Sequence, residues 1–367
     1  MLSLLVAGAM QSALVVPNPH VLVFSKTTGF RHDNIESAVA AIKKLGVDHG
    51  FQVDATEDAA AFTDANLKQY DLICFASTTG TILDDGQKKA MERFVEGGKG
   101  WMGIHSASDT EYDWPWYAEL VGAYFKSHPP GGQHVNVVTE NRGNPSTNAL
   151  PNLWIRPDEW YDWRVNPRAK VEVLASIDES YYRPQNPQDH PIAWCHWQGK
   201  GRSWYTEMGH FKEAYSDSIY LGHLYGGLMW AAQGSRRSDG AVDYSANNRG
   251  YGDCLFHAEF KAGATASSIN FGGGNSISLR DSKSVSWNQL KADDCGGTNG
   301  RAPITNASAG GDYWNTLDVS ISAKTNSISE VRLNGVVVQR DVDATGTLGR
   351  ISLPNSATFR NVWVKSR

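Results

Sequence analysis

Apolar and polar positions follow two different periods along the first part of the chain. Apolar runs at 20–24, 70–76 and 101–105 predict buried strands, and 52–54 predicts a further short strand. Helical spacing covers 34–46, 65–69 and 84–97, and Gly97-Gly98 closes the last of these segments. Strands that alternate with helices predict an α/β domain with a doubly wound, mostly parallel sheet that is covered on both faces.

The pattern changes further along the chain. Segments 135–139, 171–177, 191–197 and 203–208 are predicted strands, and 218–232 is the last predicted helix. After a polar stretch, short alternating segments predict strands at 256–260, 267–271, 276–279, 317–322, 330–333, 336–340, 349–353 and 359–365, with Asn334-Gly335 as a hairpin turn. We therefore expect an α/β domain at 19–234, a linker at 235–249 and an all-β jelly-roll sandwich at 250–367.

The first residues are apolar and include the small-residue step Ala7-Gly8-Ala9. Residues 1–18 are similar to the later part of a secretory signal, although they carry no basic segment, and an ordinary apolar N-terminus is the alternative. The stretch is too short and too interrupted for a membrane span. We expect a secreted or periplasmic protein without a membrane span.

Charge and aromatic content narrow the class of partner. The net charge is −5, and no Lys/Arg-rich run gives an electrostatic footprint for nucleic acid. Thirteen Trp and fourteen Tyr favour a saccharide, since flat rings cover the apolar faces of sugars as well as filling cores. The chain has neither a P-loop nor a Gly-x-Gly-x-x-Gly motif after its first strand, so no nucleotide cofactor is expected.

The four cysteines divide by position. Cys74 and Cys195 lie in apolar runs and are expected to be buried thiols. Cys254 and Cys295 share the last third of the chain, and in an exported protein they could form a disulfide. Because no C-x-x-C motif occurs, a structural zinc site is not expected.

His105 is the first candidate for chemistry. It stands in Gly103-Ile104-His105-Ser106-Ala107, which has the small-residue spacing of a nucleophile elbow, a sharp turn that presents one side chain at the end of a strand. Ligands bind beyond the carboxyl ends of strands in open parallel sheets. An imidazole presented there is suited to acid/base work or to binding a ligand, whereas a hydrogen-bonded histidine at a strand end is the structural alternative.

Further histidines and carboxylates flank predicted strands. His32 lies in the loop after the first strand, and His128 lies beside a Pro/Gly loop. Glu159 is the carboxylate of Asp158-Glu159 that we expect to face the ligand, because neighbouring residues on a strand point to opposite faces. A divalent metal held by some of the histidines stays an open alternative, since none has the i, i+4 helical spacing of a strong metal motif.

At these residues the sequence resembles the trehalose-utilisation (ThuA-like) family, whose domain is similar to class I glutamine amidotransferases and therefore implies a flavodoxin-like or amidotransferase-like fold. The resemblance covers roughly residues 20 to 234 and rests on Gly29-Phe30-Arg31-His32, Gly103 to Ala107, Tyr112 to Tyr117, Ser127-His128-Pro129, Asp158 to Tyr161, Asp189 to Trp194, Gly201-Arg202-Ser203 with Tyr205, and Gly209-His210. In the amidotransferases the elbow residue is Cys, so His105 argues against glutaminase chemistry.

The last third is similar to a 3-keto-disaccharide hydrolase domain with a concanavalin-like sandwich. Tyr313 to Thr316, Arg332 to Gly335, Gly349 to Leu353 and Phe359 to Val362 carry this second resemblance, while 293–311 departs from the pattern. That departure leaves open whether this part has lost any activity and serves binding or packing instead.

Both resemblances imply a saccharide ligand. The catalytic groups that we expect are His105, Glu159 and His190, and the saccharide-binding groups that we expect are His32, Asp109, Tyr112, Trp114, His128, Tyr161, Arg202, Tyr205 and His210. The expected function is hydrolysis or elimination of glycosides, including 3-keto glycosides, by acid/base chemistry in the α/β domain. The alternatives are a non-catalytic carbohydrate-binding protein with a degenerate α/β domain and an ordinary glycosidase acting on unoxidised sugar.

Overall fold

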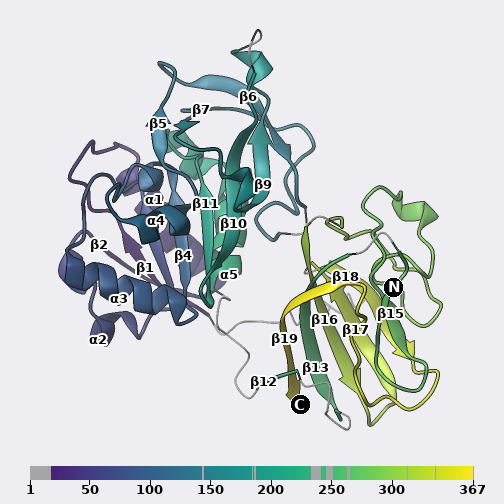
Figure 1. The fold of residues 1–367 in the computed structure, drawn as a ribbon. Coiled ribbons are helices and arrows are strands. Elements are labelled where there is room, and N and C mark those ends of the chain that lie inside the picture. Colours follow the sequence, from purple (N-terminus) through teal and green to yellow (C-terminus); the bar gives the residue numbers. More distant parts are fainter. Residues whose placement is uncertain are drawn as a thin grey trace, which may run out of the picture.

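The computed structural model of the chain describes residues 18–142, 144–183, 185, 187–232, 241–244, 251–262, 265–311, 313–334 and 336–366 (Figure 1). Apart from Asn18, the expected signal segment 1–18 lies outside these residues, and so does most of the expected linker 235–249. Within the described part of the linker, Ala241–Asp243 forms strand β12, which pairs with the last strand of the chain.

The larger sheet belongs to the N-terminal part of the chain. In spatial order its strands are β2 (Gln52–Thr56), β1 (His20–Phe24), β3 (Leu72–Ala76), β4 (Gly100–Ile104), β11 (Gly201–Thr206), β10 (His190–Gln198), β9 (Glu172–Ile177), β6 (Gln133–Thr139) and β7 (Ile155–Asp158). From β2 to β11 all neighbours are parallel.

From β11 to β7 all neighbours are antiparallel, which corrects the expectation of a mostly parallel sheet: the sheet is mixed. The reason lies in the connections. Gln198 pairs with Gly201 across a two-residue turn, and so short a connection joins only antiparallel strands, whereas parallel neighbours need a long crossover. No helical segment was predicted between 135 and 208, so this change of direction was available from the sequence.

Helices cover both faces of the parallel half, as the sequence pattern predicts. They are α1 (Ile35–His49), α2 (Asp64–Leu67), α3 (Asp85–Glu96), α4 (Pro115–Val121) and α5 (Ser218–Ala232). Successive strand residues point to opposite faces, so Val21 and Val23 pack with α1 and α5, while Leu22 and Phe24 pack with α3 and α4. The two apolar layers fix the sheet and therefore the loops at its edge.

Short elements complete this part of the chain. β5 (Phe125–Ser127) pairs with β8 (Asp162–Trp163). Single 3-10 turns are η1 (Ala59–Ala61), η2 (His105–Ser108), η3 (Pro167–Ala169), η4 (Glu179–Tyr181) and η5 (Lys212–Ser216), and η6 (Trp287–Gln289) lies in the C-terminal part. Among the residues that the structure describes, no helix has the length and apolarity needed to cross a membrane.

The C-terminal part is rich in strands. Its larger sheet has the order β12, β19 (Thr358–Ser366), β13 (Cys254–Lys261), β16 (Trp314–Ser322), β17 (Ser327–Leu333) and β18 (Val336–Asp343), and β14 (Ser268–Asn270) pairs with β15 (Ser276–Ser278). All these pairings are antiparallel. The predicted hairpin is confirmed because Leu333 pairs with Val336, whereas the predicted strand at 349–353 contributes only an isolated bridge from Ser352 to Asn270.

Cysteine positions agree with the prediction for Cys74 and Cys195, which are buried thiols. Cys254 and Cys295 are also buried, and no disulfide joins them. The disulfide that the sequence left open is therefore not formed in this structure.

Candidate active site at the carboxyl edge of the sheet

Three loops at one edge of the parallel strands bring histidines together. His32 follows β1, His105 follows β4, and His210 follows β11, and these three strands end at the same edge because they run in parallel. Glu159 and Tyr161 reach the same place from the segment that follows β7. The edge is the one at which ligands of open parallel sheets bind.

His105 occupies the sharp turn that its sequence setting predicts. Its backbone φ is 51°, which lies in the left-handed region that residues other than glycine rarely adopt. The residue is fully buried. Its Nδ1 lies 2.9 Å from the carbonyl oxygen of Glu207. Because a carbonyl only accepts, Nδ1 carries the proton, and in the neutral ring Nε2 presents a lone pair to the centre of the site.

Nε2 of His105 is the meeting point of the cluster. The Tyr161 hydroxyl lies 2.9 Å from it and donates to the lone pair. Nδ1 of His210 lies 3.2 Å from the same atom, and Oε2 of Glu159 lies 3.5 Å from it. The turn at His105 thus places one imidazole edge against a phenol, a second imidazole and a carboxylate.

Glu159 is the acidic member of the cluster. Its Oε2 lies 3.2 Å from Nδ1 of His210, and its Oε1 lies 3.3 Å from Nδ1 of His128. Burial alone would raise its pKa, but the neighbouring His105 and His210 hold the pKa of this carboxyl well below its usual range. Glu159 is therefore an ionised carboxylate at neutral pH.

His32 closes the cluster on its buried side. Its Nδ1 is hydrogen-bonded to Oγ of Ser106 at 3.2 Å, and its ring packs edge-on against His105 with centroids 4.7 Å apart. Burial, together with the neighbouring histidines, lowers its pKa to about 3, so the ring is neutral at physiological pH. With Nδ1 engaged by the serine, Nε2 is the nitrogen available to a ligand.

Four residues of the cluster each offer one ligand atom, and together these atoms could hold a metal ion. The ligand atoms of His32, His105, Glu159 and His210 all lie within 4.8 Å of one another. Imidazole nitrogens with one carboxylate oxygen form a donor set that suits zinc and other first-row divalent cations.

A buried carboxylate positions the strand end that carries His210. Asp158 accepts hydrogen bonds from the backbone N–H groups of Gly209 at 2.9 Å and His210 at 3.0 Å, and its charge is paired with Arg156 at 2.9 Å. The sequence interpretation preferred Glu159 as the working residue of the adjacent pair, and the structure gives its neighbour a supporting role. Both carboxylates therefore serve the same site from opposite sides of the backbone.

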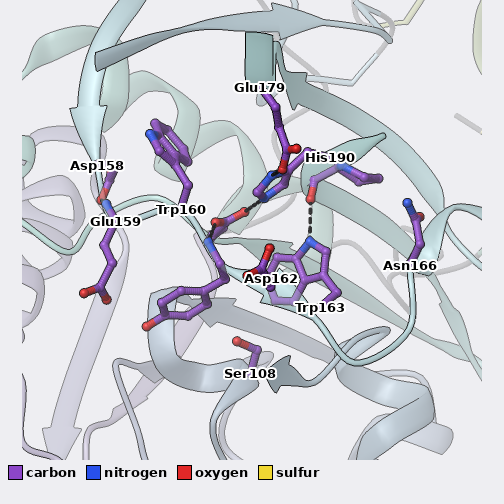
Figure 2. Close-up of polar contacts among 12 residues, drawn as sticks. Ser108, Asp158, Glu159, Trp160, Asp162, Trp163, Asn166, Glu179 and His190 are labelled. Atoms are coloured by element: carbon purple, nitrogen blue, oxygen red, sulfur yellow. Dashed lines mark hydrogen bonds and ion pairs between the residues drawn. The ribbon is translucent and has the colours of Figure 1, made fainter. Parts of the chain in front are cut away.

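His190 lies in a second buried cluster, away from the carboxylate of Glu159 (Figure 2). Its Nδ1 lies 2.7 Å from Oε1 of Glu179, and its Nε2 lies 3.3 Å from Oε2 of Glu207. Burial alone would lower the pKa of His190, but the two carboxylates outweigh that effect and raise it, so the ring is a buried imidazolium.

The second cluster supports the first through Glu207. This fully buried residue accepts from His105 through its backbone oxygen and from the backbone N–H of Tyr161 through its side chain. The structure thus departs from the expectation that His190 acts on the ligand directly: its contacts are with the carboxylates that hold His105 and Tyr161. The sequence interpretation missed Glu207, because an isolated Glu in a strand-to-loop segment carries no distinctive spacing.

Other predicted residues lie around this centre. Tyr205 is fully buried, and its hydroxyl donates to the backbone oxygen of His105 at 2.7 Å, so it supports the turn. The Tyr112 hydroxyl donates to Asp109 at 2.5 Å, which makes the pair part of the loop packing after the turn. Trp114 stacks on Trp116 with ring centroids 5.0 Å apart and contacts no member of the histidine cluster.

Arg202 lies at the other end of its strand. It pairs with Gly100 at the start of β4, whereas Thr206 pairs with Ile104 at the end that carries His105. The Arg202 guanidinium donates to Glu259 of the C-terminal part at 2.5 Å. The sequence interpretation assigned Arg202 to the saccharide site, and the structure corrects this, because a residue at the start of a parallel strand faces the opposite edge of the sheet.

Phenylalanine rings surround the cluster, and the sequence interpretation did not single them out. Phe125 packs on Tyr161 with centroids 4.4 Å apart, and Phe211 packs edge-on against His210 at 4.9 Å. Phe30 packs edge-on against His32 at 4.8 Å while 68% of it stays exposed. Such rings could cover the apolar face of a sugar beside the polar cluster.

Comparisons with known proteins agree with this fold. Residues 20–231 match the model of a family described as trehalose utilisation (ThuA). The crystal structure of a ThuA-like protein from Bacteroides uniformis ATCC 8492 is similar over 59% of this chain and 93% of that one, with 28% identity and a TM-score of 0.52. A ThuA-like protein from Parabacteroides merdae ATCC 43184 matches 59% of this chain and 91% of its own, with 18% identity and a TM-score of 0.50, and shows the fold alone. No curated protein matches the sequence.

Proposed function

The chain belongs to the trehalose utilisation (ThuA) family, and from this premise we propose that its α/β domain is a carbohydrate-active enzyme that cleaves or converts glycosides by acid/base chemistry. The observation that carries the proposal is the ionised carboxylate of Glu159 between three histidines, at the edge of the sheet where ligands bind. A carboxylate in contact with imidazoles provides a base and an acid within one hydrogen-bond network.

The solvent-facing side of the cluster indicates how a substrate would approach. The side chains of His105 and Glu159 are 0% and 11% exposed, whereas those of His210 and His128 are 25% and 37% exposed. A saccharide would therefore meet His128 and His210 first and reach Glu159 between them. Phe30 stands beside the cluster and would cover one face of the ring.

A 3-keto glycoside is the substrate class that this chemistry suits best. Its carbonyl acidifies the C2 proton, which Glu159 would remove to form an enolate. Collapse of the enolate restores the C3 carbonyl, forms a C1–C2 double bond and breaks the bond between C1 and the glycosidic oxygen. That oxygen takes a proton from His128, which lies 3.3 Å from the carboxylate and is half-exposed. Neither water nor a redox partner is needed for this elimination.

The resemblance of the C-terminal part to a 3-keto-disaccharide hydrolase domain with a jelly-roll sandwich supports the same substrate class. Its antiparallel pairing and strand-rich core are compatible with that architecture. Within this proposal, the C-terminal part serves saccharide binding, and the whole protein acts outside the cytoplasm.

Turnover of glycosides and their 3-keto forms, followed by chromatography and mass spectrometry, tests the proposal. Glu159→Gln keeps the shape of the side chain but removes the base, and we expect a loss of about 10²–10⁴ in turnover. Trp114→Phe is the control, since Trp114 packs away from the cluster. Calorimetric binding of oligosaccharides without any turnover by the wild type would instead favour a carbohydrate-binding protein, and equal turnover by Glu159→Gln would refute the assignment of the base.

A further inference from the structure

We infer that His32, His105, His210 and Glu159 form a binding site for one zinc-class divalent cation. The inference goes beyond the proposed acid/base function, and cation binding itself does not depend on the identity of the substrate. It starts from the spacing of the donor atoms rather than from any motif, because the four residues are scattered over 178 positions between His32 and His210.

Three of the donor atoms form a triangle of the right size. His105 Nε2 to His210 Nδ1 is 3.2 Å, His210 Nδ1 to Glu159 Oε2 is 3.2 Å, and Glu159 Oε2 to His105 Nε2 is 3.5 Å. Nitrogen and oxygen ligands lie about 2.0–2.2 Å from zinc, so two ligands of a tetrahedral ion are about 3.3–3.6 Å apart. The three edges therefore match one face of such a coordination shell.

The protonation of His105 also indicates a cation. Because Nδ1 donates to the Glu207 carbonyl, Nε2 carries a lone pair in the neutral ring. This nitrogen lies 3.5 Å from the carboxylate oxygen Oε2 of Glu159. Without an ion, that lone pair accepts from the Tyr161 hydroxyl 2.9 Å away, so binding of a cation requires this hydroxyl to turn away from Nε2. A divalent ion would satisfy the lone pair, the carboxylate and the imidazole of His210 together.

Three of the four ligands also have a partner that fixes their orientation. His105 is held by a backbone carbonyl, His32 by Ser106 Oγ, and the second oxygen of Glu159 by His128. Metal-binding histidines almost always carry such an outer hydrogen bond through the other ring nitrogen. Polar residues that meet by chance would not be expected to direct one donor atom each at a common point.

The ligand types select the class of ion. Three imidazoles and one carboxylate favour zinc and its first-row neighbours over calcium or magnesium, which take mostly oxygen ligands. Where the proposed function holds, an ion at this place would polarise the carbonyl of a keto sugar and leave Oε1 of Glu159 as the base.

The test uses the full chain without a histidine tag, treated with a chelator, dialysed and titrated with zinc chloride by calorimetry. Metal content is measured separately by mass spectrometry. We expect one zinc ion per chain in the wild type and a loss of affinity of at least about 100-fold in Glu159→Gln and in His210→Gln. His134→Gln is the matched control, because His134 is exposed and lies outside the cluster, and it should bind zinc as the wild type does.

Circular dichroism and thermal melts of the zinc-free variants exclude unfolding as the cause of a loss. Cobalt titration gives a second readout, because a four-ligand site produces strong visible absorption that the two ligand variants should lack. The inference is overturned if the wild type takes up no stoichiometric zinc, or if both ligand variants bind it with unchanged affinity. Zinc uptake without turnover of any saccharide would support the inference and count against the proposed function. Turnover of a saccharide by a chain that binds no zinc would support the proposed function and overturn the inference.

Discussion

Glu259 offers the sharpest test of how the C-terminal strands are held against the α/β domain. It is buried in β13 and accepts from Arg202 of β11 at 2.5 Å, from Arg360 of β19 at 2.7 Å and from Asn361 at 3.1 Å. One carboxylate thus neutralises two guanidinium groups from different parts of the fold. Glu259→Gln removes the charge and leaves the shape, so it probes the electrostatics alone.

The magnitude follows from the charge that is left behind. Burial would raise the pKa of Glu259, but Arg202 and Arg360 outweigh it and lower the pKa to about 2, from 4.5 in the unfolded chain. That difference corresponds to about 3 kcal/mol of stability at neutral pH. Breaking a buried ion pair from one side costs about 3–5 kcal/mol in other proteins, which agrees with this figure.

Urea unfolding at pH 7, followed by tryptophan fluorescence, measures the effect. We expect Glu259→Gln to lose about 3 kcal/mol, and to separate the unfolding of the two parts into distinct transitions. Glu330→Gln is the control, since Glu330 pairs with Arg332 on the same sheet and is more exposed, and it should lose less than about 1 kcal/mol.

The pH dependence gives an independent check with a defined sign. A depressed carboxyl pKa contributes stability above pH 4.5 and loses it as the pH falls toward 2. The difference between wild type and Glu259→Gln should therefore shrink over that range. A variant as stable as the wild type at pH 7, or a difference that does not change down to pH 2, would refute the buried contact between the two parts.

Three further outcomes follow from the site. Tyr161→Phe removes the hydroxyl that donates to His105, and it should cost about 1 kcal/mol and shift the Nε2 resonance of that ring in nitrogen NMR, whereas an unmoved resonance would deny the contact. Asp158→Asn weakens the anchor of the backbone at His210, and it should lower zinc affinity by about 10–100-fold in calorimetry while Asp162→Asn does not. His190→Gln leaves two buried carboxylates without their shared cation, and it should cost about 3–5 kcal/mol in urea unfolding, so full stability would contradict the buried ion triad.

Most of the helices and strands could be predicted from the sequence, because apolar residues recur with the helical period in the helices and with the strand period or as short apolar runs in the strands. Predicted helix 218–232 coincides with α5, and predicted helix 84–97 encloses α3, whose first turn is capped by Asp84. The position of the histidine cluster at one edge of the sheet could also be predicted. Since parallel strands end together, loops after β1, β4 and β11 had to bring His32, His105 and His210 to one place.

The features of the site that could not be predicted from the sequence depend on contacts between distant segments of the chain. No local spacing indicates that Glu207 supports His105, because its contribution is a backbone oxygen that any residue could supply. The placement of Arg202 depends on which end of β11 it occupies and on a partner 57 positions away, Glu259. A buried charge and a ligand-binding charge look alike in a sequence, and only their partners tell them apart.

The two ends of β11 carry the domain contact and the candidate site, and the strand's own pairing argues that they act independently. Arg202 and Thr206 are four residues apart, about 13 Å along an extended strand, and β4 and β10 hold β11 on both sides over this stretch. Sites more than about 10 Å apart with no shared partner usually contribute additively. Glu259→Gln should therefore lower stability without changing zinc affinity. A large change in affinity in that variant would mean that docking of the C-terminal strands sets the geometry of the histidine cluster.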